Sequence, residues 1–145
     1  MANNGERAAT LIRALEASVV GDSSVVAHLF TDDVCGWAPI ATVTSAAELA
    51  VELEDRGEAF SDVELDVSPL DVGGDCAAVE WIATVTHSGP LEVRGKVIEP
   101  TGVRVCVHGV TVAEFVGDRI RSFRQYWDET ELLVQLGLTN EGEPR

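Results

Sequence analysis

The stretch that decides the fold is 101–138, TGVRVCVHGVTVAEFVGDRIRSFRQYWDETELLVQLGL. It contains two runs rich in β-branched and aromatic residues, 103–116 and 120–127, which are typical of strands. Only the residues Gly-Asp-Arg at 117–119 separate them, and glycine and aspartate favour a tight turn. The sequence therefore predicts a long antiparallel hairpin.

A short helix is predicted directly after this hairpin. Asp128 and Glu131 have the spacing of a capping box, in which two side chains satisfy free backbone N–H groups at the start of a helix. Gly137 follows as a stop signal. Between these signals the apolar residues recur at helical spacing: Leu132, Leu133 and Leu136.

The composition is that of an acidic globular protein. The chain has 145 residues, of which 46% are hydrophobic and 24% charged, and this fits one domain over 1–145 with a core of ordinary size. The formal net charge is −15 and Lys96 is the only lysine, so the surface field repels phosphate backbones and anionic membranes. We therefore expect neither nucleic acid nor membrane as a partner and attribute the acidity to solubility.

Cysteine usage and the absence of long apolar runs predict the compartment. Cys35, Cys76 and Cys106 form no CxxC pair, which is typical of reduced, mostly buried thiols in a cytoplasm. No run approaches about eighteen apolar residues, and 1–21 lacks the pattern of a signal peptide. No group of His, Asp, Glu and Cys has ligand spacing, so we expect no metal and no other cofactor.

The first half of the chain is expected to be mainly helical. Apolar residues at i, i+3, i+4 and i+7 over 7–20 indicate an amphipathic helix that ends at Gly21. Asp22 is expected to cap a second, shorter helix that runs through Phe30. A capping box that begins at Ser45 opens a third helix.

Strands are predicted around and after these helices. Residues 34–43 are apolar but contain glycine and proline, which indicates a short or edge strand. Strict alternation over 62–67 predicts a half-buried strand that ends at Pro69, and a further strand is predicted over 76–86.

The segment 87–101 is interrupted by glycine and proline, so we expect a long connection at the rim of the sheet. Its apolar residues would lie over an opening: Leu91, Val93 and Ile98. Residues 140–145 are expected to fray. The order of elements indicates an α+β domain whose curved sheet wraps around the helices and leaves a conical cavity for a small apolar ligand.

Four segments carry a resemblance to a known family. They are FTDDV at 30–34, ATVTHSG at 83–89, PTG at 100–102 and VAEFVGDRIRSFRQYWDETELLVQLGL at 112–138. These segments resemble the SnoaL-like proteins, the polyketide-cyclase branch of the NTF2-like superfamily. The resemblance implies a cone-shaped α+β barrel, commonly a homodimer, that acts on polyketide-like small molecules of antibiotic biosynthesis.

The sequence departs from this family at the residues that carry its chemistry. In the aromatic polyketide cyclases an aspartate acts as acid and base three residues ahead of the one that matches Asp128. Gln125 holds that position here, and a glutamine amide can hydrogen-bond but has no usable basicity. The two histidines that assist the aspartate align with Phe123 and Thr111.

The patterns of two related enzyme groups are absent as well. The Arg-x-Asp pair of limonene-epoxide hydrolases falls at Trp81 and Ala83, and the base of ketosteroid isomerases falls at Ala38. Epoxide opening by the first pattern is therefore excluded on sequence, and the base of the second is missing from its expected place.

Period-2 alternation predicts which residues face the cavity. If Gln125 faces inward, Phe123 and Trp127 flank it on the same strand. Such a lining is aromatic and aliphatic with few polar groups, which fits holding an apolar substrate better than proton transfer. The neighbouring strands then contribute Val105, Val107, Gly109, Thr111 and Ala113, and Trp81, Ala83, Val85 and His87.

Three residues are candidates for catalysis. Gln125 comes first, through a hydrogen bond to a substrate carbonyl, with a buried amide tied to the backbone as the alternative. His87 and Asp128 follow, with a turn partner and a helix cap as their alternatives. His28 and His108 are expected at the surface or an interface. Candidate substrate-binding residues, for which a place in the core is the alternative, are Trp37, Trp81, Val85, Val107, Thr111, Phe123 and Trp127.

Three functions stay open at this point. The first is a cyclase that fixes a reactive conformer while Gln125 polarises a carbonyl, as a cycloaddition or conjugate addition requires. The second is a small-molecule carrier or pathway scaffold without turnover. The third keeps proton transfer, with His87 or Asp128 as the base. Val110 and Val112, on the outer face of the predicted hairpin, are candidates for a dimer interface.

Overall fold

The computed structural model describes residues 4–39 and 41–138, a mixed α+β fold. Its helical elements are α1 (Asn4–Val20), the 3-10 turn η1 (Ser23–Val25), α2 (Val26–Leu29), α3 (Ala46–Ala59) and α4 (Glu129–Gln135). Its strands are β1 (Phe30–Ala38), β2 (Ala41–Val43), β3 (Phe60–Leu70), β4 (Cys76–His87), β5 (Leu91–Val93), β6 (Lys96–Ile98), β7 (Arg104–Val116) and β8 (Arg119–Trp127). In this part of the chain no helix has the length and apolar character needed to cross a membrane.

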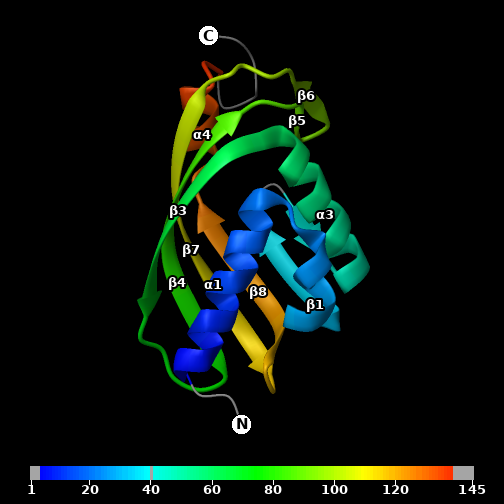
Figure 1. The fold of residues 1–145 in the computed structure, drawn as a ribbon, viewed down its shortest axis with the longest axis vertical. Coiled ribbons are helices and arrows are strands. Elements are labelled where there is room, and N and C mark those ends of the chain that lie inside the picture. The colour runs from blue at the N-terminus through cyan, green and yellow to red at the C-terminus, as the bar shows by residue number, and fades with distance from the viewer. Residues whose placement is uncertain (1–3, 40, 139–145) are drawn as a thin grey trace.

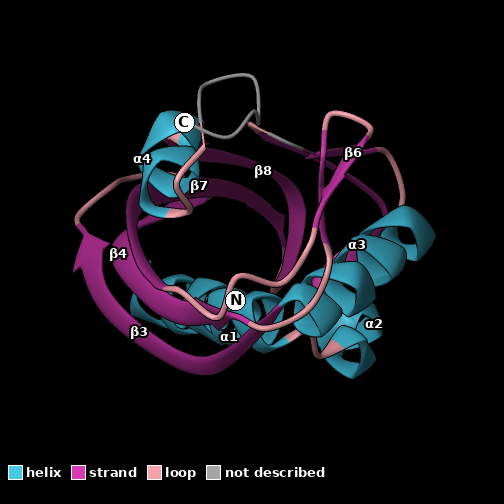
Figure 2. Ribbon diagram, turned by 90° about the horizontal axis from the view of Figure 1, so that it is seen from above, coloured by secondary structure: helices cyan, strands magenta, loops and turns pink. Residues whose placement is uncertain are grey.

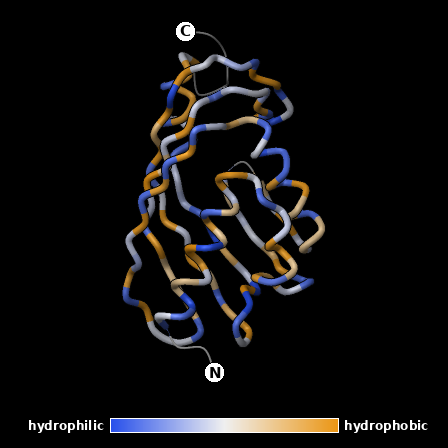
Figure 3. The backbone as a smooth tube through the Cα atoms, viewed as in Figure 1, coloured by the Kyte–Doolittle hydropathy of each residue, from blue (hydrophilic) through white to orange (hydrophobic). Residues whose placement is uncertain are grey.

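One curved sheet organises the molecule (Figure 1). Its six strands follow the order β2-β1-β8-β7-β4-β3, and every neighbouring pair is antiparallel except β1 with β8. Seen from above, the sheet curls through most of a circle, and α1 and α3 lie along its open side (Figure 2). Hydrophobic and hydrophilic residues alternate along the strands (Figure 3), so one face of the sheet packs inward against the helices. The predicted α+β architecture is confirmed.

The β7–β8 hairpin forms with the predicted turn and register. Gly117 takes a positive φ of 62°, which a tight turn demands and glycine adopts without strain. Thr111 pairs with Gln125 on β8, and Gly109 pairs with both Trp127 and Trp81. The inner face of these strands is therefore the one that alternation predicts.

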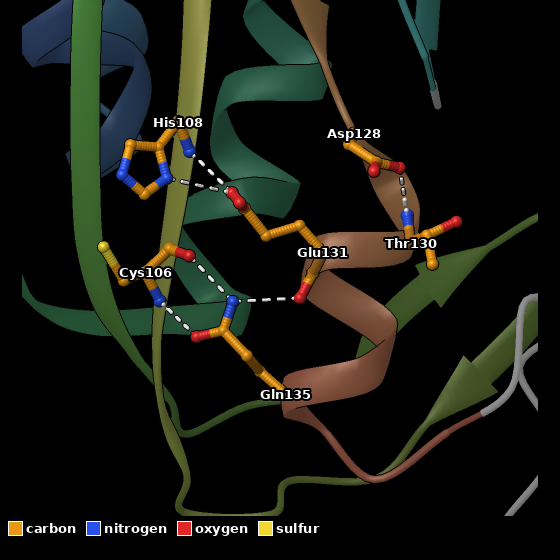
Figure 4. A network of polar contacts seen from close by, with 6 residues as sticks. All are labelled: Cys106, His108, Asp128, Thr130, Glu131 and Gln135. Atoms are coloured by element: carbon orange, nitrogen blue, oxygen red, sulfur yellow. Dashed lines mark hydrogen bonds and ion pairs between the residues drawn. The ribbon is translucent and has the colours of Figure 1, made fainter.

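Side chains of α4 take the place of a strand partner along the first part of β7, beyond the end of β8. Because β8 ends at Trp127, opposite Gly109, the described part of β7 before that point has no strand partner on this side. Gln135 pairs with both backbone groups of Cys106: its Oε1 accepts from Cys106 N (2.7 Å) and its Nε2 donates to Cys106 O (2.7 Å) (Figure 4). Glu131 Oε1 accepts from His108 N (2.7 Å).

The predicted capping box is right at Asp128 and wrong at Glu131. Asp128 is the N-cap, and its carboxylate accepts from Thr130 N at 2.9 Å (Figure 4). Glu131 does not return to the cap because its carboxylate binds the exposed His108 on β7. His108 thus lies at the surface, as expected.

Two predicted boundaries in the first half differ from the structure. The second helix ends at Leu29, and Phe30 opens β1, which is a full strand of nine residues and not a short one. Gly36 does not break this strand: a Cβ there would lie 2.0 Å from the Phe123 ring, so the glycine makes room for an aromatic side chain. Strand β3 also continues past Pro69, which is tolerated because β3 is an edge strand.

The connection 87–101 contains a small hairpin that the sequence did not predict. Strands β5 and β6 pair around Arg94 and Gly95, whose positive φ values of 52° and 79° match the tight turns of two-residue hairpins. The strands are only three residues long, too short for alternation to reveal them. Its expected apolar contacts do form, with Leu91, Val93 and Ile98 buried.

The cysteines are partly as expected. Cys76 and Cys106 are half-buried, but Cys35 is exposed because it points outward from β1. The predicted fraying of 140–145 lies outside the described residues.

Candidate functional site

A cavity of about 580 Å³ lies between the inner face of the sheet, the helices α1 and α3, and the β5–β6 hairpin. This volume is in the range of sites that enclose drug-sized ligands. A small pocket of about 50 Å³ is lined by some of the same residues. The residues common to both are Leu15, Ser18, Glu52, Arg56 and Gln125.

One side of the cavity is formed by alternate residues of four neighbouring strands, which we call the sheet wall. It is apolar and aromatic apart from Gln125, as predicted. Of the candidates named from sequence, Gln125, Trp81, Val85, Val107 and Trp127 lie here. The complete sheet wall comprises Leu65, Trp81, Ala83, Val85, Val105, Val107, Gln125 and Trp127.

Trp81 is held in place by its neighbours on β7. Its Nε1 donates to Thr111 Oγ1 at 2.9 Å, and its ring lies over Gly109, where an added Cβ would come within 2.2 Å. Thr111 is 2% exposed and lines the small pocket, so it positions the indole and does not reach the large cavity. Phe123 lines the small pocket too, with its ring centroid 6.0 Å from that of Phe30.

Trp37 does not line either cavity, contrary to expectation. On β1 the residues Val34, Gly36 and Ala38 are buried, so Trp37 points to the outer face and is 44% exposed. There its ring centroid lies 5.4 Å from that of Tyr126.

His87 and Asp128 also lie outside the cavity lining. His87 is fully buried at the end of β4, where Nδ1 accepts from Thr101 N (3.2 Å) and lies 2.9 Å from Thr101 Oγ1. Burial lowers the pKa of this imidazole, and backbone hydrogen bonds with Gly89 and Ile98 oppose that shift. Asp128 is the exposed cap of α4. The structure therefore places His87 as a turn partner and Asp128 as a helix cap, which are the alternatives to catalysis given for them from the sequence.

The opposite side of the cavity carries charge, and sequence reasoning missed it. Ser18 of α1 and Glu52 and Arg56 of α3 form what we call the helix wall. Arg56 Nη1 donates to Ser18 Oγ at 2.6 Å. Burial lowers the pKa of the Arg56 guanidinium, while the charge of Glu52 raises it. The expectation of a lining with few polar groups is therefore wrong for this side.

A sequence signal for the helix wall did exist. Glu52 and Arg56 follow the buried Leu49 by three and seven residues, so they lie on the face of α3 where the helical period calls for apolar side chains. A charged residue at a position where an amphipathic helix normally has an apolar one faces either a charged partner or a cavity.

Comparison of the sequence with known protein families identifies the family of this chain. The sequence matches the family model of the SnoaL-like domain over residues 11–123. The chain belongs to this SnoaL-like family.

Solved structures similar to this SnoaL-like chain share its fold. AclR from Streptomyces galilaeus, a candidate hydroxylase, is 29% identical with a TM-score of 0.75, covering 93% of this chain and 98% of that one. A candidate SnoaL-like polyketide cyclase from Jannaschia sp. CCS1 is 20% identical (TM-score 0.77; 98% and 95% covered). IdmH from Streptomyces antibioticus, a candidate polyketide cyclase, is 21% identical (TM-score 0.72; 91% and 99% covered). No curated protein matches the chain.

The mouth of this SnoaL-like cavity is ringed by exposed charges and spanned by the β5–β6 hairpin. Asp55 and Glu58 of α3 and Glu92 and Arg94 of the hairpin are exposed residues of the lining. Arg94 Nη2 lies 2.7 Å from Glu129 Oε2, and this ion pair joins the hairpin to α4. The cavity is thus apolar on the sheet side, charged on the helix side and lined at its mouth by a hairpin that an ion pair joins to α4.

Proposed function

We propose that this SnoaL-like protein is a cyclase that closes a ring within a polyketide-like intermediate of antibiotic biosynthesis. The observation that carries the proposal is the place of Gln125, which lines both the large cavity and the small pocket in an otherwise apolar sheet wall. From there the amide can donate a hydrogen bond to a carbonyl oxygen of an enclosed ligand. Such a donor stabilises the negative charge that grows on this oxygen during conjugate addition or polar cycloaddition.

The apolar walls supply the second part of the proposed mechanism. A flexible chain enclosed between Trp81, Trp127 and Val107 loses most of the conformers in which its reacting ends are apart. Orientation of this kind lowers barriers by about 7–11 kcal/mol in the best intramolecular models. Two of the similar structures bear the name polyketide cyclase, which supports the same class of reaction.

The proposal is tested by incubating the purified protein with the linear intermediate and following the product ratio by chromatography. Gln125→Ala should lower the rate of ring closure about 100-fold, as does loss of one oxyanion donor elsewhere. Arg124→Ala, on the adjacent outward-facing position, is the matched control and should leave the rate unchanged. An unchanged product profile for Gln125→Ala contradicts the proposal, and tight binding without turnover by the wild type favours a carrier.

A second candidate is ring closure by proton transfer, because the carboxylate of the helix wall, Glu52, lines both the large cavity and the small pocket. We infer that Glu52, and neither His87 nor Asp128, would be the base in such a reaction. The charged groups around it are Arg56, Asp55 and Glu58 on α3 and Glu92 and Arg94 on the hairpin.

The pH dependence of kcat/KM separates the two mechanisms. Proton transfer predicts a rate that falls in acid, and Glu52→Gln should abolish turnover, whereas the matched Glu54→Gln on the same helix should not. A flat profile together with an active Glu52→Gln variant removes this candidate.

We further propose that the protein is a homodimer that pairs through the outer face of the sheet. Trp37 and Tyr126 are 44% and 49% exposed there and lie against each other, and Val110 and Val112 are half-buried on the same face. Tyr126→Lys should convert a dimer into a monomer in sedimentation velocity measurements. A wild-type protein that sediments as a monomer at micromolar concentration contradicts this proposal.

A further inference from the structure

Arg56 is placed differently from the other inward-facing arginine of the fold. Arg7 is 8% exposed and is held by the protein: Nη1 donates to Gly74 O (3.2 Å), Nη2 lies 3.3 Å from Asp75 Oδ1, and the guanidinium lies over the Phe115 ring, although its buried Nε has no hydrogen-bond partner among the described residues. The one hydrogen bond of the Arg56 guanidinium among the described residues is to Ser18 Oγ (2.6 Å). Since a guanidinium carries five N–H donors, Arg56 keeps most of its donors at the wall of the cavity.

Glu52 does not consume these donors. It precedes Arg56 by one helical turn, but none of the ion pairs between described residues joins the two. Burial lowers the pKa of the guanidinium, and the charge of Glu52 only opposes that shift. Arg56 therefore presents a positive charge with free N–H groups to the cavity, opposite the apolar sheet wall.

Free donors at this place suit a ligand with a negative charge. A hydrogen bond from a guanidinium to an anionic oxygen is stronger than one between neutral groups, and the low dielectric beside an apolar wall strengthens it further. The planar fork of arginine matches two oxygens that share one negative charge, as in a carboxylate.

We propose that Arg56, with Ser18 beside it, binds an anionic oxygen of the substrate, so that the cavity selects apolar ring-sized molecules bearing a carboxylate or an enolate. This inference rests on the proposed function, because it assigns a substrate class to the same cavity. Gln125 on the sheet wall contacts the reacting carbonyl, and Arg56 on the helix wall fixes the other end of the molecule. Arg56 is thus a binding residue.

The acidic surface does not prevent this recognition. Asp55, Glu58 and Glu92 at the mouth are exposed, so salt screens them over a Debye length of about 8 Å. Arg56 acts inside the cavity, where the lower dielectric strengthens its attraction for an anion. At low salt these carboxylates at the mouth slow the entry of an anion. They do not remove the contact between Arg56 and an anion that is already bound.

The test compares matched charged and neutral probes by fluorescence titration. The carboxylate pair is 2-naphthoate and 2-naphthamide, and the enolate pair is 2-hydroxy-1,4-naphthoquinone, ionised at neutral pH, and its 2-methoxy ether. The wild type should bind at least one anion more tightly than its neutral partner by about tenfold or more. The pair that shows the preference identifies the anionic group.

Variants assign the preference to its residue. Arg56→Gln should bind the anion and its neutral partner about equally, while Arg13→Gln, on the exposed face of α1, should keep the wild-type preference. Arg56→Lys keeps the charge without the fork and should retain part of the preference even if Arg56→Gln folds poorly.

The outcomes separate this inference from the proposed function. Equal binding of charged and neutral probes by the wild type, or a preference that survives Arg56→Gln, overturns the role of Arg56 and leaves the apolar cavity in place. Failure of all four probes to bind contradicts the cavity as a ligand site and with it both proposals.

Discussion

The two walls of the cavity differ in what they contribute and in how far the sequence reveals them. The sheet wall is an apolar surface with one amide, and its residues follow from the alternation of β4, β7 and β8. The helix wall carries Ser18, Glu52 and Arg56, and none of these was named from the sequence. The comparison teaches that in this fold the sheet gives the cavity its shape, whereas the helices give it its charge.

The largest expected effect is the loss of ligand binding when a bulky side chain is added to the sheet wall. Ala83 is 9% exposed and faces the cavity, so the ring in Ala83→Phe should occupy the space of the ligand and bring 2-naphthamide binding below detection. Thr84→Phe places the same ring on the outer face and serves as the control. Tight binding by Ala83→Phe in the fluorescence titration would show that the ligand does not lie against this wall.

The rigidity of the sheet wall is tested at Gly109. A Cβ at this position would lie 2.2 Å from the Trp81 ring, so Gly109→Ala must displace the indole and break its hydrogen bond to Thr111. We expect a loss of about 1–3 kcal/mol in the free energy of unfolding, measured by urea denaturation. Gly73→Ala is the matched control, because an added Cβ there meets no atom within 4 Å. Equal stability of both variants would contradict a rigid wall.

A smaller effect, on the rate of ligand release, is expected from a substitution in the β5–β6 hairpin. Arg94 is 65% exposed on its side of the 2.7 Å ion pair with Glu129, so solvent screens much of the interaction. Arg94→Gln should nevertheless leave the nearly buried Glu129 carboxylate without its cation, and the dissociation rate of 2-naphthamide in stopped-flow experiments should rise several-fold. Arg119→Gln at the exposed start of β8 is the control. An unchanged dissociation rate in Arg94→Gln would mean that the hairpin does not limit ligand release.

The smallest effect is expected from His87, which is buried at the end of β4 and belongs to neither wall. Burial lowers its pKa in the folded protein, so the unfolded chain binds more protons below the ordinary pKa of about 6.5. The free energy of unfolding should therefore fall as the pH drops below that value and stay constant above it. Urea denaturation between about pH 8 and pH 5 measures this, with His108→Gln as a surface control that keeps the slope. Stability that is flat over this range would contradict a neutral buried imidazole.

The sequence predicts those parts of the molecule that depend on contacts between residues close together in the chain. It does not predict the parts that depend on distant contacts. The β7–β8 hairpin, its register and the cap at Asp128 depend on residues close together in the chain. Gln125 and Trp127 therefore lie on the predicted face, whereas Phe123 and Thr111 line only the small pocket. Trp37 was misplaced because β1 pairs in parallel with β8, far away in sequence, and its inward face is set by that pairing.

The helix wall could not be predicted in the same way. That Arg56 meets Ser18 depends on how α3 docks against α1, and 38 residues separate the two. The partner of Glu131 was missed for the same reason, because its carboxylate replaces a strand partner on β7. Helical periodicity gives the buried face of each helix but not what that face contacts.

A crystal structure of the protein with 2-naphthamide tests the central claim most directly, since that claim is that a ligand lies between the two walls with its carbonyl on Gln125. We predict the naphthalene ring against Trp81 and Trp127 and the amide Nε2 of Gln125 at about 2.9 Å from the ligand oxygen. A ligand bound on the outer face at Trp37 and Tyr126, or a Gln125 amide that turns to the backbone and leaves the ligand oxygen without this donor, would contradict it.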